Sequence, residues 1–411
     1  MSRDRRVKAS SSTASFSRDS SSPATSSSGS RGRLSSIPTA PAIVVLVGVL
    51  CVVGLVMVGC ASPVVSLSLY GSSWAILARQ CLWMGVGIVA LILLARIDYR
   101  RWRPLRGLLV VGSLVLLVAV LVPGLGVTSG GSSRWIGYGM LRLQPSEFMK
   151  LALVVFTADL VVRRGDRMHQ PKQVIMPVLA VLGVSGLLIL KEPDMGTAMV
   201  LCCIAFGILF MGGVPMRSIM KVLGVFVVLA ILVGIADPYR RDRILSFLDP
   251  TSHQSGTGYQ VWQSLIGMGS GHLFGLGLGG GREKWGSLPN AHTDFIFSVV
   301  GEELGMIGTV AVLALLFALA WFGFRAANAA PDRFGSLMAI GITVWVTSQA
   351  VINVGAVIGM LPVTGIPLPF VSFGGSSLVI TLASMGILLN IASQERQAER
   401  PSTSRRRLAR A

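Results

Sequence analysis

The chain has 411 residues, of which 52% are hydrophobic and 13% are charged, and its mean hydropathy is +0.69. Soluble proteins carry about 25% charged residues, so this composition excludes an ordinary soluble protein and indicates a membrane protein. The formal net charge of +18 could suggest nucleic acid, but its distribution along the chain fits membrane topology better, and we expect no nucleic-acid partner.

The two ends of the chain are polar. Residues 1–39 are rich in Ser and Arg with almost no apolar content, which predicts a disordered cytoplasmic tail. They are not expected to be a signal peptide, because the first apolar run is long enough to span a membrane. Residues 393–411 are predicted to be a second cytoplasmic tail, whose arginines either contact anionic lipid or are simply solvated.

Ten apolar runs of near-spanning length lie between the tails, since a crossing needs about 20 residues. They predict an all-α polytopic membrane protein with ten transmembrane helices in residues 40–392 and with both termini cytoplasmic. The runs are residues 40–61, 77–97, 107–123, 147–163, 174–190, 197–215, 222–236, 304–325, 336–358 and 376–392.

The basic residues gather in alternate connections and in both tails, which the positive-inside rule places in the cytoplasm. Ten of the 36 basic residues lie elsewhere and are not needed for orientation. Each could be a surface anchor or a helix-end snorkeller, but as a set facing one compartment they indicate a site for an anionic ligand. They are Arg79, Arg134, Arg142, Lys150, Lys191, Arg240, Arg241, Arg243, Arg282 and Lys284.

The fourth run opens with Glu147 and Lys150, three residues apart and therefore on one helix face. They form either a structural ion pair or a site in which Lys150 holds a phosphate or supports a carboxylate. Arg134, beside Trp135 in the preceding loop, is a second candidate cation. In the short turn Lys191–Thr197, Asp194 is expected to cap the sixth span.

One connection, residues 237–303, is much longer than the other outward ones, which favours a functional loop. Its residues Tyr259–Met268 have apolar side chains at helical spacing and predict a short interfacial helix. The glycine-rich Gly275–Arg282 lacks the rest of a nucleotide-binding loop and is predicted to be a flexible loop.

Acidic residues cluster where this connection meets the eighth span. Asp294 precedes an apolar helical stretch and follows His292 and Thr293, and Glu302 and Glu303 come about two and a half turns later. Asp294 could simply cap the helix. Charges at a membrane edge are costly, however, and partial desolvation raises the pKa of a carboxylate toward the range of a general base.

Three prolines and three glycines interrupt the apolar sequence of Leu361–Ser377, between the ninth and tenth spans. They predict a non-helical segment that lines the same outer site, with Ser376 as a supporting residue. The five cysteines fall in apolar runs without ligand or disulfide spacing and are expected to be core residues. No His and Cys cluster of metal spacing occurs in the sequence.

Several motifs in order resemble the SEDS family (shape, elongation, division and sporulation) of peptidoglycan polymerases, over about residues 40–392. The matching segments are RWI at Arg134–Ile136, QPSEFMKLAL at Gln144–Leu153, EPDMGTA at Glu192–Ala198, YRRDRILSFLDP at Tyr239–Pro250, AHTDFIFSVVGEELG at Ala291–Gly305, and LPVTGIPLPFVSFGGSS at Leu361–Ser377.

The resemblance implies glycosyl transfer from lipid II on the outer face of the bacterial cytoplasmic membrane, with inversion to a β-1,4 glycan. It implies that Asp294 is the general base. The leaving undecaprenyl pyrophosphate needs positive charge nearby. The candidates are Lys150, Arg134, Arg243, Arg79 and Lys284, with Glu147, His292, Thr293, Glu302, Glu303 and Ser376 in supporting roles.

The resemblance also implies a class B penicillin-binding protein transpeptidase as partner, together with other division proteins. It gives no certain cofactor and leaves a divalent cation open. YRRDRILSFLDP and the KWGSLPNAHTDF context are more like FtsW, the division branch at the septum, than RodA, the elongation branch. A RodA-like polymerase and a lipid II flippase or transporter are the alternatives.

Three positions differ from the family pattern. Phe373 stands where Tyr is common, Glu192 stands where Gln is common, and Gly286 stands where many members have an acidic residue. The last difference puts in doubt a second carboxylate at that point, for which Glu283 could substitute.

Overall fold

The computed structural model describes residues 37–129, 132–138, 141–165, 170–236, 258–286 and 288–399. Pro38–Ala411 form one unit of α-helices with one small sheet. Residues 1–36, residues 400–411 and Arg243 lie outside the described part, so the expectations for the two tails and for that cation stay predictions.

Each of the ten predicted apolar runs coincides with a long helix. Helices suit such sequences because they satisfy every backbone polar group internally, as a membrane requires. The ten are α1 (Thr39–Ala61), α3 (Ala75–Arg96), α4 (Trp102–Leu121), α5 (Pro145–Arg163), α6 (Pro171–Lys191), α7 (Met195–Met211), α8 (Met216–Ala236), α11 (Ile296–Asn328), α12 (Arg333–Val357) and α13 (Gly375–Glu399).

Seven helices of the described part are long and apolar enough to cross a membrane: α1, α3, α4 with the turn before it, α6, α11, α12 and α13. Helix α7 has only 17 residues, and α5 carries Glu147, Lys150 and Asp159 within its length. The chain is therefore a mostly helical, multi-pass membrane protein, and the count of ten spans stays a prediction.

Short elements connect the long helices. Strands β1 to β3 form an antiparallel sheet in the order β1-β2-β3, with Val127 opposite Trp135 and Ile136 opposite Leu143, and the sequence analysis did not predict this sheet. Helix α10 confirms the predicted helix at Tyr259. The short elements are α2 (Pro63–Tyr70), η2 (Tyr99–Arg101), β1 (Gly126–Ser129), β2 (Ser132–Tyr138), β3 (Leu141–Leu143), α10 (Tyr259–Ser270) and η4 (Glu283–Trp285).

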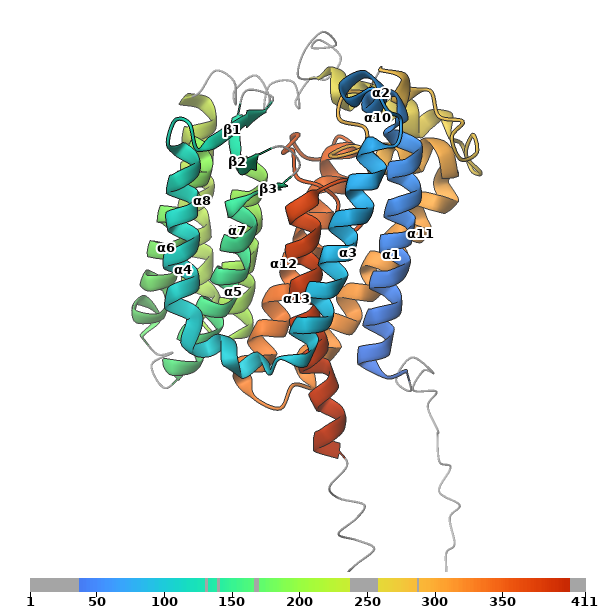
Figure 1. Cartoon of the computed structure of the whole chain (residues 1–411). Coiled ribbons are helices and arrows are strands. Elements are labelled where there is room, and N and C mark those ends of the chain that lie inside the picture. The colour runs from blue at the N-terminus through green and yellow to red at the C-terminus, as the bar shows by residue number, and fades with distance from the viewer. Residues whose placement is uncertain are drawn as a thin grey trace, which may run out of the picture. The chain divides into compact units, whose positions relative to one another are not determined.

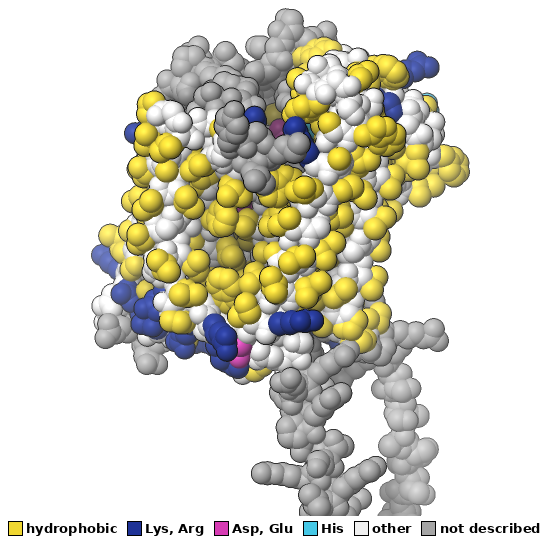
Figure 2. Space-filling model, in the orientation of Figure 1, with side chains coloured by type: hydrophobic (Ala, Val, Ile, Leu, Met, Phe, Trp, Pro, Cys, Tyr) yellow, Lys and Arg dark blue, Asp and Glu magenta, His cyan; other side chains and the backbone are white. Residues whose placement is uncertain are grey.

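The long helices run side by side, with α12 and α13, the most buried of the seven apolar helices named above, in the middle. Helix α12 packs on α5, α7, α11 and α13, and α13 packs along α3. The sheet, α2 and α10 lie at one end of the bundle, here called the sheet end, and α1 starts and α13 finishes toward the other, here called the tail end (Figure 1). Figure 2 shows apolar side chains around the middle and Lys and Arg side chains along the tail end.

Helix α11 is broken at Gly305, whose φ of 67° and ψ of −163° are not helical. The preceding loop replaces the hydrogen bonds lost there: Leu276 N donates to Glu302 O (3.0 Å), and Met306 N donates to His272 O (3.0 Å). Because α11 begins at Ile296, Glu302 and Glu303 lie inside this helix. They belong to the helical stretch that was predicted to follow Asp294, and the break at Gly305 lies where the predicted span of residues 304–325 begins. The bounds of the long connection stay a prediction.

Candidate active site

Asp294 lies at the sheet end, two residues before α11 begins, and is partly exposed. The Nδ2 group of Asn353, on α12, donates to the carbonyl oxygens of Asp294 and Ile366, both at 2.8 Å. One buried amide therefore joins the Asp294 turn to the segment between α12 and α13. The sequence analysis missed Asn353, although an amide in an apolar helix is a signal that could have identified it.

The segment Leu361–Ser377 has no helix before Gly375, which confirms that most of it is non-helical. Protein groups satisfy its backbone: Gln349 Nε2 donates to Pro367 O (3.0 Å), and Leu368 N donates to Ser372 Oγ (2.8 Å). Phe373 N donates to His292 O (3.0 Å), which attaches the segment to the loop before Asp294. Such bonds are what an irregular segment at membrane depth requires.

Arg134, on β2, reaches toward Asp294. Its Nε donates to the backbone oxygen of Glu192 (3.0 Å), and its Nη2 donates to that of Pro193. A Cβ placed on Gly365 would lie 3.6 Å from Arg134 Nη1 and 3.6 Å from Asp294 Oδ2. The guanidinium and the carboxylate thus approach the same glycine.

Glu192 follows α6 and is only 1% exposed, and neither of its carboxyl oxygens has a hydrogen-bond partner. Burial raises its pKa to about 8; Asp194 adds to this and Arg134 opposes it. A buried carboxyl without a partner is therefore protonated near neutral pH. Asp194 itself accepts from Thr197 N (3.0 Å), which confirms it as the cap of α7.

His292 and Thr293 complete the turn before Asp294. Burial lowers the pKa of His292 to about 4, so its imidazole is neutral at physiological pH. Its ring centroid lies 5.8 Å from that of Phe373, and its Nδ1 is buried without a hydrogen-bond partner. Thr293 Oγ1 donates to Asn290 O (3.1 Å). Their supporting roles stay predictions.

The acids of α11 hold the glycine-rich loop. Glu303 accepts from Gly279 N (3.0 Å) and from Lys284 Nζ (3.0 Å), and Glu302 accepts from Arg282 N (2.5 Å). The predicted flexible loop is therefore attached to the helix at several points. Burial raises the pKa of the Glu283 carboxyl, and the negative charge of Glu302 raises it further.

Gly286 follows this loop with a φ of 114°, in the region that favours glycine. An acidic residue there would be strained, which gives a physical reason for the difference from the family pattern at this position.

Lys150 and Glu147 lie inside the bundle, 1% and 2% exposed. Lys150 Nζ donates to Glu147 Oε1 and to Gln349 Oε1, both at 2.8 Å, and lies 4.9 Å from the centre of the Trp345 ring. Through Gln349 this network supports the segment that contains Pro367. These contacts fit the first of the two alternatives, a structural ion pair. A phosphate-binding role for Lys150 stays a prediction.

Two further predicted residues lie near the same end. The guanidinium of Arg79 stacks over the Tyr70 ring at 4.0 Å, and its Nε is buried without a partner. Ser376 Oγ accepts from Gln144 N (3.1 Å), which joins the start of α5 to that of α13. Within the described ranges, no group of three or more His, Cys, Asp or Glu side chains could hold a metal ion.

The chain matches a known family and several of its members. A model of the cell cycle proteins FtsW, RodA and SpoVE matches residues 41–397. Stage V sporulation protein E of Bacillus subtilis is 40% identical over 359 residues, 86% of this chain and 97% of the relative. A probable peptidoglycan glycosyltransferase FtsW of Nitrosomonas europaea is 42% identical over 352 residues, 84% and 91% of the two chains.

Solved structures are also similar. The rod shape determining protein RodA of Thermus thermophilus is 30% identical with a TM-score of 0.61, over 86% of this chain and 96% of that one. A chain from a peptidoglycan synthase complex, described as coordinating polymerization and crosslinking, is 31% identical with a TM-score of 0.70, over 86% and 98% of the two chains.

Proposed function

The chain belongs to the FtsW, RodA and SpoVE family of cell cycle proteins, and we propose that it is a peptidoglycan glycosyltransferase that polymerises lipid II. The names of its relatives support this activity. The observation that carries the proposal is the approach of the Asp294 carboxylate and the Arg134 guanidinium to one glycine, Gly365, at the end of an apolar bundle.

In the proposed reaction Asp294 is the general base. Its carboxylate takes the proton from the 4-hydroxyl of the acceptor sugar as that oxygen attacks the anomeric carbon of the donor. The bond from this carbon to the undecaprenyl pyrophosphate breaks, and the pyrophosphate leaves with the electron pair. Attack opposite the leaving group inverts an α-linked donor to a β-1,4 linkage.

The developing charge on the pyrophosphate needs fixed positive groups. Arg134 is suited to this because two backbone carbonyls hold its guanidinium while Nη1 lies near Gly365, which the Asp294 carboxylate also approaches. Arg79 and Arg243 are proposed to bind the same pyrophosphate. Lys150 and Lys284 are paired with buried acids, so we propose that they act by fixing the walls of the site.

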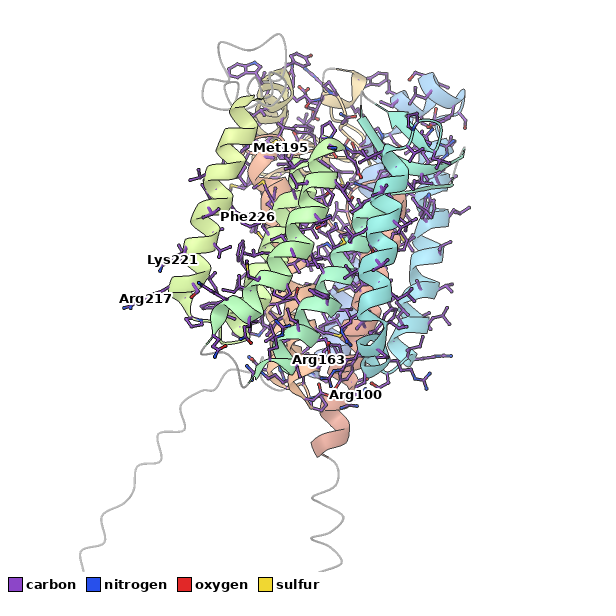
Figure 3. All side chains as sticks on the ribbon, turned by 90° about the vertical axis from the view of Figure 1, so that its left-hand side faces the viewer. Arg100, Arg163, Met195, Arg217, Lys221 and Phe226 are labelled. Atoms are coloured by element: carbon purple, nitrogen blue, oxygen red, sulfur yellow. The ribbon has the colours of Figure 1, made fainter. Side chains whose placement is uncertain are left out.

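We further propose ten spans with both termini in the cytoplasm and the sheet end outside. Three labelled side chains, Arg100, Arg163 and Arg217, lie toward the tail end, whereas Met195 lies near the sheet end (Figure 3). This distribution supports the orientation through the positive-inside rule. In the proposed orientation Asp294 faces the outer side, where we propose that lipid II is polymerised.

The proposed role is septal synthesis in partnership with a class B penicillin-binding protein and other division proteins. The peptidoglycan synthase complex to which one similar chain belongs supports such a partner. Complementation distinguishes the branches: the gene should restore growth in cells depleted of their division polymerase. Rescue only of cells depleted of the elongation polymerase would contradict the septal role.

The activity is tested by reconstituting the chain in vesicles with a class B penicillin-binding protein and fluorescent lipid II. We expect glycan strands that a muramidase digests. Transfer of lipid II across the bilayer without polymer would contradict the enzyme proposal and favour a flippase.

A further inference from the structure

Asp159 is a buried acid that the proposed reaction does not use. It lies on α5 near the tail end, and its side chain is 0% exposed. Arg103 Nε donates to its Oδ1 (2.6 Å), while Arg106 Nε and Arg163 Nε lie 2.9 Å and 2.8 Å from its Oδ2. One carboxylate therefore faces three guanidinium groups, a set here called the arginine triad.

The triad has donors left over. All three arginines use Nε toward Asp159, and each guanidinium carries further N–H groups on its two Nη atoms. Within the described ranges these groups make one side-chain hydrogen bond, from Arg106 Nη1 to Arg103 O (3.2 Å). The three side chains are 41%, 29% and 51% exposed, so a ligand can reach them, and their Nε contacts with Asp159 hold them together.

The triad also lies at the depth of lipid headgroups. Arg103 and Arg106 belong to the first two turns of α4, and Arg163 is the last residue of α5. Ends of membrane helices lie at the level of the phosphates. Figure 2 shows basic side chains gathered there, directly beyond the apolar surface.

We propose that the arginine triad, held by Asp159, binds the phosphodiester headgroup of an anionic phospholipid such as phosphatidylglycerol. Planar guanidiniums donate two parallel hydrogen bonds to phosphate oxygens. Three guanidinium charges against one carboxylate leave a net charge of +2, which attracts a headgroup with one negative charge. Two simpler roles would not require this arrangement. Basic residues that only orient the chain by the positive-inside rule need no fixed geometry. An ion pair that only joins α4 to α5 needs one of the three arginines.

The test measures lipid binding to the full chain in detergent by native mass spectrometry, with phosphatidylglycerol or phosphatidylethanolamine added. The variant is Arg163→Gln, because Arg103 and Arg106 still neutralise Asp159 and the chain should fold. The matched control is Arg217→Gln on α8, which removes one exposed basic residue of the same half of the bundle. An unchanged unfolding temperature confirms that both variants are folded.

We expect the native chain to prefer phosphatidylglycerol, and Arg163→Gln to weaken its binding by about tenfold against about twofold for the control. Equal losses of binding in the two variants would mean that the lipid responds to positive charge in general and not to the triad, and would overturn the proposal. A third arm adds inorganic phosphate at millimolar concentration. Displacement of phosphatidylglycerol by free phosphate would show that the triad takes a soluble anion, which would overturn the lipid assignment.

Discussion

The acidic side chains at the two ends of the bundle have different surroundings. At the tail end Asp98, Asp159 and Asp332 each lie within 3.4 Å of an arginine nitrogen. At the sheet end buried carboxyl oxygens of Glu192, Glu283 and Glu302 have no hydrogen-bond partner, and neither has His292 Nδ1.

An unsatisfied buried polar group is costly. Such groups can remain at an active site, where a substrate can satisfy them. At the tail end Asp159 Oδ2 also lacks a hydrogen bond, but it lies 2.9 Å and 2.8 Å from the Nε atoms of Arg106 and Arg163. The difference in charge pairing supports the proposed placement of the chemistry at the sheet end.

The sharpest test of this contrast substitutes one acid at each end. Asp294→Asn should lower lipid II polymerisation by about 10³-fold, because the amide cannot accept the acceptor proton. The control, Asp98→Asn, removes an exposed acid of the tail end and should leave the rate within twofold. The measurement is the amount of glycan formed per minute. A near-native rate for Asp294→Asn would contradict the placement of the chemistry at the sheet end.

Arg134→Lys should lower polymerisation by about a hundredfold, because an ammonium cannot bond two carbonyls and still direct a donor toward Asp294. Arg282→Lys, an exposed change at the same end, is the control. The measurement is the initial rate at saturating lipid II. Equal rates for both variants would show that Arg134 only supports the Glu192 turn.

Lys150→Met should destabilise the protein by about 3 to 5 kcal/mol, because it leaves Glu147 buried and unpaired. Unfolding in denaturing detergent measures this loss, and Glu147→Leu added to Lys150→Met should recover part of it. At the tail end, Arg100→Gln breaks half-exposed pairs and should cost less than about 1 kcal/mol. A greater cost for Arg100→Gln would show that burial does not set the strength of these ion pairs.

The effect of Glu192→Gln on the stability of the fold should depend on pH. The folded-state pKa of about 8 exceeds the ordinary value of 4.5, so the protonated form stabilises the fold. This contribution is full below about pH 4.5 and is lost as the pH rises to about 8. Glu192→Gln should raise the unfolding temperature at pH 9 by about 2 to 5 °C and change it little at pH 5. A difference that does not depend on pH would show that Glu192 is ionised throughout.

The sequence predicted the ten helices because apolar runs of this length have few alternatives in a membrane. It also predicted the α7 cap and the irregular Leu361–Ser377, since a side-chain oxygen before a helix and clustered prolines have local effects. It could not predict which cations face Asp294, because pairing depends on contacts between distant residues, as for Lys150 with Gln349 and Arg134 with the Glu192 carbonyl. The small sheet was missed because its strands have only four, seven and three residues.

The break in α11 constrains the length of the chain before it. Loops usually accept inserted residues, but the loop Gly271–Gly277 is bonded to α11 on both sides of Gly305, through Glu302 and Glu303 before it and Met306 and Ile307 after it. One extra residue would shift these pairings against a helix whose first turn follows Asp294. In natural variants of this protein, insertions should therefore be absent from this surface loop even where its composition changes.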